Sequence, residues 1–131
     1  KHTWIYTDEF YILFDNEYSA QFYYELYKRA RKWGGIPTGI TQNVEDLLRS
    51  ETARTMLSNS QFLLLLNQSA SDRQEFSKLL KVSDVQLNYV TNADTGSGLL
   101  ISGKNVIPFK KKFPKDSRLY KVLNTKIGEE N

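Results

Sequence analysis

Short apolar runs alternate along this chain with longer amphipathic stretches. The first run, residues 4–6, is rich in aromatic and β-branched side chains, which is typical of a buried strand. Similar runs at 36–41, 62–66, 99–101 and 106–109 predict four more strands. The run at 62–66 has polar residues on both sides, and this pattern predicts a fully buried parallel strand.

The stretch at 17–33 predicts a helix. Asp15 and Asn16 provide a capping signal before it, and Gly34 and Gly35 end it. Apolar residues recur at every fourth position of this stretch, which predicts a single buried stripe made of Tyr18, Phe22, Leu26 and Ala30. Further helices are predicted at 44–48, at 52–57 with Ser50 as its cap, and at 72–80.

Strands that alternate with helices predict an α/β fold, with a mainly parallel sheet flanked by helices. The runs at 99–101 and 106–109 are joined by a short turn containing Gly103, which predicts a small β-hairpin near the C-terminus. Pro108 indicates that the second strand of this hairpin lies at an edge.

Composition narrows the functional classes. The 131 residues suffice for one domain with a hydrophobic core. No apolar run approaches the ~20 residues of a membrane span. The absence of cysteine excludes disulfides and thiolate metal sites. Residues 1–99 carry 10 Lys and Arg against 12 Asp and Glu, whereas residues 100–131 carry 8 against 3. The basic part either forms a solvated surface or meets an anionic partner such as DNA.

Polar side chains follow three of the predicted strands: Asp8-Glu9, Thr41-Gln42 and Asn67-Gln68. The carboxyl ends of parallel strands meet at one sheet edge, so we expect these residues to converge on a ligand. An apolar strand followed by Asp and Glu has the form of a Walker B motif. In that motif Asp8 holds Mg²⁺, through water, and Glu9 orients the attacking water; Gln42 is suited to sense the γ-phosphate.

A phosphate-binding loop of the form GxxxxGK[ST] occurs nowhere in the chain. If Asp8 and Glu9 form a Walker B pair, the Walker A segment lies upstream. We therefore expect the chain to be a fragment of a longer protein.

The run YKRARKWGGIPTGITQNVEDLL, taken with the first strand, closely resembles the large ATPases of type IV secretion and conjugative DNA transfer, in the HerA–FtsK branch of P-loop motor ATPases. The resemblance continues through SQFLLLLNQSASDR and GSGLLISGKNVIPF to SRLYKVLNT, and so covers nearly the whole chain. It implies that residues 1–131 are the C-terminal portion of a RecA-like ATPase domain, from the Walker B strand onward.

The resemblance implies ATP and Mg²⁺ as cofactors, with Asp8 as the Mg²⁺ residue, Glu9 as the catalytic base and Gln42 as the sensor glutamine. Arg31 becomes the arginine-finger candidate, acting on the ATP of a neighbouring subunit. Arg29 and Arg73 are weaker candidates, because a basic helix end also explains Arg29 and a capped surface helix explains Arg73. The resemblance also implies a hexamer at the cytoplasmic face of the membrane that works with other secretion-system components.

Without the Walker A segment, we expect this fragment alone to be inactive. In RecA-like sheets the missing strand lies beside the one ending at Gln42, so we expect an open edge and self-association. Two alternatives stay open: a non-catalytic assembly module, and a DNA-translocating coupling ATPase whose basic tail contacts DNA. A metal hydrolase is a weaker alternative, because His2 is the only histidine.

Overall fold

A computed structural model describes residues 1–42, 44–67, 69, 72–91, 93–110 and 114–123. The predicted α/β class is confirmed, with a parallel sheet and an antiparallel hairpin. The elements are β1 (Thr3–Thr7), the 3-10 helix η1 (Phe10–Phe14), α1 (Glu17–Arg29), the 3-10 helix η2 (Ala30–Trp33), β2 (Gly35–Gly39), α2 (Val44–Arg49), α3 (Glu51–Asn59), β3 (Phe62–Leu65), α4 (Asp72–Leu80), α5 (Asp84–Leu87), β4 (Ser97–Ser102), β5 (Asn105–Lys110) and α6 (Arg118–Leu123).

The helix boundaries follow local capping chemistry. The Asn16 side chain accepts hydrogen bonds from the backbone N–H groups of Tyr18 (2.9 Å) and Ser19 (3.4 Å), so α1 begins as predicted. The Ser50 hydroxyl accepts from the Ala53 N–H at 3.3 Å and caps α3. Gly34 has a φ of +70°, a left-handed conformation that suits glycine, and it ends the helical segment before β2.

The strands of the described residues form two separate sheets. β1 and β2 pair in parallel, with Thr3 opposite Gly35 and Thr7 opposite Gly39. β3, β4 and β5 form an antiparallel sheet in that order, and β4 and β5 are the predicted hairpin. Pro108 lies in β5, an edge strand, as its missing N–H requires.

The prediction for the run at 62–66 is wrong in two respects. β3 pairs antiparallel with β4, with Leu65 opposite Leu99. Leu65 is buried, whereas Phe62, Leu64 and Leu66 are exposed. Side chains alternate across a strand, and helices cover only one face of this sheet, so only half of the apolar run enters the core.

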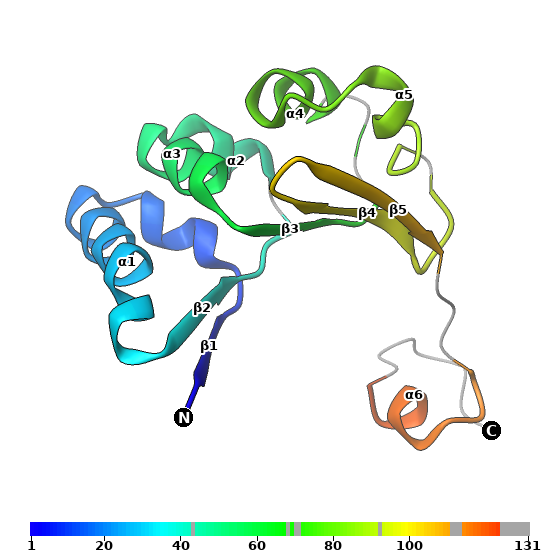
Figure 1. The fold of residues 1–131 in the computed structure, drawn as a ribbon, viewed down its shortest axis with the longest axis horizontal. Helices are drawn as coiled ribbons and strands as arrows, with labels where there is room; N and C mark the ends of the chain where they lie inside the picture. Colours follow the sequence, from blue (N-terminus) through cyan, green and yellow to red (C-terminus); the bar gives the residue numbers. More distant parts are fainter. Residues whose placement is uncertain (43, 68, 70–71, 92, 111–113, 124–131) are drawn as a thin grey trace.

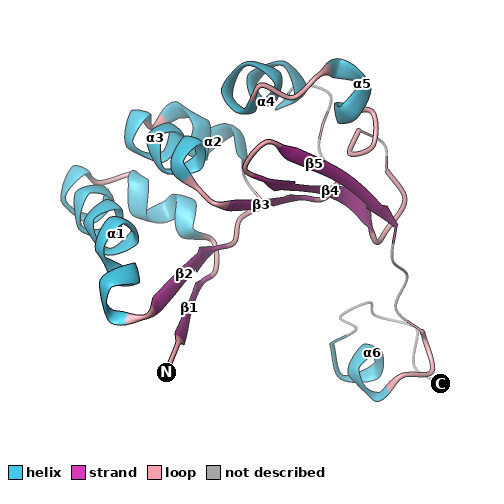
Figure 2. Ribbon diagram, viewed as in Figure 1, coloured by secondary structure: helices cyan, strands magenta, loops and turns pink. Residues whose placement is uncertain are grey.

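Helices α1 to α5 lie on one side of the two sheets (Figures 1 and 2), and the core lies between these layers. One cluster packs α2, α4 and α5 on the antiparallel sheet, with Leu87 and Leu99 fully buried at its centre. A second cluster joins η1, α1, α2 and α3, and its buried members are Phe10, Tyr23, Leu47, Ala53 and Met56. Burial of these apolar surfaces provides the main driving force for the fold.

The predicted buried stripe on α1 is also wrong in part. Ala30 is buried and Leu26 packs against the second cluster, but Tyr18 and Phe22 are exposed. The physical reason is the helical repeat. Each step of four residues rotates about 40° around a 3.6-residue helix, so three steps spread the four residues across about 120°. Tyr23, which lies between the predicted positions, packs into the core instead.

Four strands have an open edge. Among the described residues, β1 and β2 pair only with each other, and β3 and β5 each pair only with β4. An open edge beside β2 agrees with the expectation from the sequence. Within the described part of the chain, no helix has the length and apolar character needed to cross a membrane.

Candidate active site

Glu9 and Gln42 lie together at the carboxyl ends of β1 and β2. The Gln42 side-chain amide nitrogen donates to Glu9 Oε1 at 3.1 Å. The Gln42 backbone N–H donates to Glu9 Oε2 at 3.4 Å. Glu9 is half-buried and Gln42 is exposed, so the pair lies at the protein surface, where a ligand has access.

The contact depends on a sharp turn after β1. Glu9 has a φ of +46°, which is unusual for a residue with a side chain, and its N–H donates to Asp8 Oδ1 at 3.0 Å. Two backbone hydrogen bonds join the segments that follow β1 and β2: the Ile40 N–H donates to the Thr7 oxygen (2.9 Å), and the Phe10 N–H donates to the Ile40 oxygen (3.2 Å). These bonds bring Glu9 next to Gln42. A strained backbone of this kind occurs often at functional sites.

Packing beneath the turn fixes its position. Phe10 is buried and its ring lies against Gly39; a Cβ added at Gly39 would lie 2.9–3.0 Å from the ring carbons. Gly39 therefore allows the close approach of η1 to β2. Gly39 lies inside the strand predicted at 36–41, but the sequence alone did not indicate its role in seating the Glu9 turn.

Asp8 is exposed beside this pair, and one of its oxygens accepts the Glu9 N–H. Among the described residues, no group of three or more His, Asp or Glu side chains is arranged to hold a metal ion. A single carboxylate nevertheless fits Mg²⁺ in nucleotide sites, where the ion keeps several waters and takes its other ligands from substrate phosphates. Asp8 therefore suits Mg²⁺ bound together with a nucleotide.

The third predicted strand end does not join the site. Asn67 Oδ1 accepts the backbone N–H of Ala93 at 3.0 Å, so this side chain anchors the segment that leads to β4. Gln68 lies outside the described residues. Because β3 belongs to the antiparallel sheet, its end is not held beside those of β1 and β2 by strand pairing.

Arg31 lies at the other end of β2. It is exposed in η2, before the strand begins, whereas Gln42 follows the strand's end. The five residues of β2 alone separate these positions by roughly 17 Å. Arg31 therefore does not join Glu9 and Gln42 within one chain.

The two weaker arginine candidates have structural partners. Arg29 Nε lies 2.7 Å from Glu25 Oε2, one helical turn earlier on α1. Arg73 donates to the backbone oxygen of Asp84 at 2.7 Å and lies 3.6 Å from its carboxylate, which ties α4 to α5. These contacts account for both side chains without a ligand.

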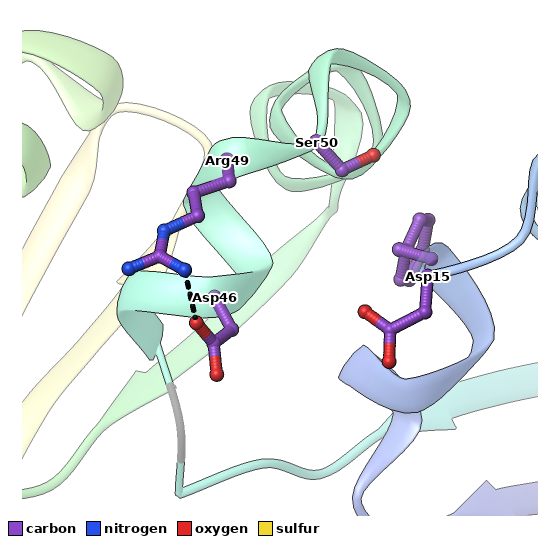
Figure 3. A pocket seen from close by; sticks show the side chains of 5 residues that line it. Asp15, Asp46, Arg49 and Ser50 are labelled. Carbon is purple, nitrogen blue, oxygen red and sulfur yellow. Dashed lines mark ion pairs between the residues drawn. The ribbon is translucent and has the colours of Figure 1, made fainter.

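A separate pocket of about 250 Å³ is lined by Phe14, Asp15, Asp46, Arg49 and Ser50. Figure 3 shows the Arg49 guanidinium turned toward Asp46, at 3.0 Å, with Asp15 across the pocket. Arg49 also pairs with Glu45 at 2.9 Å. The volume is below the range of about 300–1,000 Å³ common for small-molecule sites, and the exposed ion pairs explain its charges. We assign it no ligand.

Comparison with known proteins supports the fold. The chain matches no protein-family model and no curated protein sequence. Among solved structures, it is similar to VirB4 of Thermoanaerobacter pseudethanolicus, with a TM-score of 0.79 and 29% sequence identity over 87% of this chain. The match covers 32% of the VirB4 chain, so the present chain spans about a third of that protein's length. The arrangement of strands and helices is thus similar to part of VirB4.

Proposed function

We propose that residues 1–131 are the C-terminal portion of a RecA-like ATPase domain in a motor that powers type IV secretion or conjugative DNA transfer, of the HerA–FtsK branch. The observation that carries this proposal is the contact between Glu9 and Gln42 at the ends of two parallel strands. The similarity of the fold to VirB4 supports the same class of protein.

In this proposal Glu9 acts as the general base. Its carboxylate takes the proton from the water that attacks the γ-phosphate, a contribution of typically ~10²–10⁴-fold. The two hydrogen bonds from Gln42 hold the carboxylate in a fixed orientation. The Gln42 amide oxygen is an acceptor, and it suits a water or hydroxyl at the γ-phosphate.

Asp8 holds Mg²⁺ through water, and the ion supplies charge neutralisation for the phosphates when it is bound. The Walker A segment, which would bind the phosphates, belongs to an upstream part of the protein. Without it, this chain alone lacks most of the groups that bind ATP and is inactive.

Arg31 acts in trans. Its position before β2 places it away from the Glu9 site of its own chain, and it is exposed on η2. No ion pair holds it among the described residues. In a hexameric ring such a side chain can reach the nucleotide of the next subunit and stabilise charge on the transferred phosphoryl group. The hexamer works peripherally at the cytoplasmic face of the membrane, with other secretion-system components.

The open edges favour a second candidate, a non-catalytic assembly module that self-associates by strand pairing. The edge of β2 is a poor partner. The Gly34 oxygen accepts a hydrogen bond from the Thr3 N–H, and the Ile40 N–H donates to the Thr7 oxygen. In a parallel pair every second residue directs its backbone groups to the partner strand, so the residues in between, among them Pro37, direct theirs to the open edge. Because Pro37 lacks an N–H, the edge of β2 is a poorer site for strand addition than the open edge of β3, which contains no proline.

A DNA-coupling ATPase is the third candidate, because residues 100–131 are basic. In the structure Lys110 pairs with Asp94 at 2.9 Å, while Lys111 and Lys112 lie outside the described residues. DNA binding that weakens steeply with salt would favour this candidate over the other two.

The test compares ATP binding and ATP hydrolysis in the longer protein that contains this chain, as wild type and as Glu9→Gln. We expect ATP binding to be retained and the hydrolysis rate to fall about a hundredfold or more. Glu51→Gln, an exposed carboxylate in the first turn of α3, is the matched control. Unchanged hydrolysis in Glu9→Gln would remove the main support for the ATPase proposal.

A further inference from the structure

Helix α1 carries a second row of aromatic side chains, on the face turned away from the core. Tyr18 is 84% exposed, Phe22 is 65% exposed and Trp33 is 73% exposed. Tyr18 and Phe22 recur with Glu25 and Arg29 every three or four residues along α1, which places these four on one face, and Trp33 of η2 borders the same hollow as Arg29. The row from Tyr18 to Trp33 is roughly 22 Å long.

The core does not need these side chains. On the inner face, Tyr23 packs against Phe10 at a ring-centroid distance of 6.0 Å and against Tyr27 at 5.9 Å. No ring contact involves the outer row within the described part of the chain. Figure 1 shows α1 at one end of the molecule, with its outer face open. Exposed Trp, Tyr and Arg side chains in a cluster are typical of the energetic centre of a protein interface.

The charges along α1 and η2 change sign from one end to the other. Asp15 and Glu17 lie at the start of α1, and Lys28 and Lys32 lie toward the end of this helical segment. The face is therefore complementary to a copy of itself in the antiparallel direction. In such a pair the acidic start of one helix meets the basic end of the other.

The structure also offers a recess for a partner side chain. A hollow of about 520 Å³ is lined by Lys28, Arg29, Lys32 and Trp33. Consider an antiparallel pair of α1 helices whose two-fold axis passes between Glu25 and Leu26. In this pair Tyr18 of one copy lies opposite Trp33 of the other copy, at the hollow that this Trp33 lines. Phe22 lies opposite the partner's Arg29, a pairing that favours cation–π contact.

We propose that the outer face of α1 and η2 binds a second copy of this chain, in an antiparallel, isologous helix pair. Such a contact closes on itself and does not extend into a ring. It is therefore separate from the trans contact of Arg31 and from strand addition at β3, and it does not depend on ATP hydrolysis.

The first test measures the molar mass of the 131-residue chain by sedimentation over a wide range of concentration. We expect a species of twice the chain mass of 15.2 kDa. Phe22→Ser and Trp33→Ser remove exposed rings, and each should weaken the dimer at least about tenfold, as loss of a central aromatic contact does. Tyr89→Ser, which removes an exposed ring from another surface, is the matched control and should leave the dimer unchanged.

The second test reverses charges that lie outside the hydrophobic core. Glu17→Lys and Lys32→Glu should each weaken the dimer, and the double variant should restore it, because the two ends remain complementary. Circular dichroism checks that each variant is folded. Lys104→Glu, in the turn of the hairpin, is the charge control.

The third test fixes the register, using the absence of native cysteines. A mixture of Tyr18→Cys and Trp33→Cys chains should form disulfide-linked dimers faster than either variant alone. A monomer at all concentrations would overturn the proposal. So would a dimer whose dissociation constant is unchanged by Phe22→Ser and Trp33→Ser, or disulfide cross-linking that is as fast for Tyr18→Cys alone as for the mixture. A monomeric chain that binds single-stranded DNA through Trp33 would overturn it as well.

Discussion

Gln42 contacts both carboxylate oxygens of Glu9, through its side-chain amide at 3.1 Å and its backbone N–H at 3.4 Å. The two residues are 33 positions apart in the sequence. Their contact exists because β1 and β2 run parallel and the backbone bonds at Ile40 continue beyond the strands. The carboxylate is thus held by a neutral donor, an arrangement that fixes its direction and leaves it unpaired with any cation among the described residues.

Gln42→Ala should therefore slow ATP hydrolysis in the longer protein about 10- to 100-fold, because the Glu9 carboxylate loses its side-chain partner and its alignment. ATP binding, measured with a fluorescent analogue, should change much less. Gln61→Ala, which removes an exposed glutamine before β3, is the control. Equal hydrolysis in both variants would show that the Glu9–Gln42 contact has no catalytic role.

The left-handed backbone at Glu9 predicts a conflict between stability and function. Glu9→Gly relieves the strain of a φ of +46°, whereas Glu9→Ala retains it, and both remove the carboxylate. The Gly variant should be the more stable of the two by about 1 kcal/mol in urea denaturation, with hydrolysis lost in both. If the Ala variant proves equally stable, the turn at Glu9 is not strained in solution.

Tyr23 predicts a loss of stability in alkaline solution. Burial raises the pKa of Tyr23 above its ordinary value of 10.0, an effect that the Thr7 side chain offsets in part and Tyr27 increases. Above that ordinary value the unfolded chain loses this proton while the folded chain keeps it, so the free energy of unfolding falls as pH rises. Tyr23→Phe should lose stability less steeply than wild type above pH 10, as followed by urea titrations at several pH values. Identical pH profiles would contradict the assignment.

Leu99 should be critical to the antiparallel sheet. Its side chain is fully buried between β4 and the helices, so Leu99→Ala should lower the free energy of unfolding by about 2–5 kcal/mol. Leu119→Ala, at an exposed position of α6, should change it by less than about 0.5 kcal/mol. Comparable losses in the two variants would show that α6 packs against the core in solution.

The candidate site could be largely predicted because it depends on short-range rules. An apolar strand ending in Asp8 and Glu9, and a second strand ending before Gln42, place these residues at one edge if the strands are parallel neighbours. The structure has that pairing. The positive φ of Glu9 was not predictable, because glutamate has no preference for that conformation and the turn is held by Phe10 beneath Gly39.

By itself, the sequence determined the elements: where helices are capped at Asn16 and Ser50, where Gly34 ends one, and where apolar runs form strands. These features follow from hydrogen bonding and sterics within a few residues. Only the tertiary structure decided that β3 runs antiparallel to β4, and that Tyr23 rather than Tyr18 or Phe22 enters the core. Strand direction and burial depend on which distant surfaces meet, and an apolar residue on α1 has the same local preference whether it faces the core or solvent.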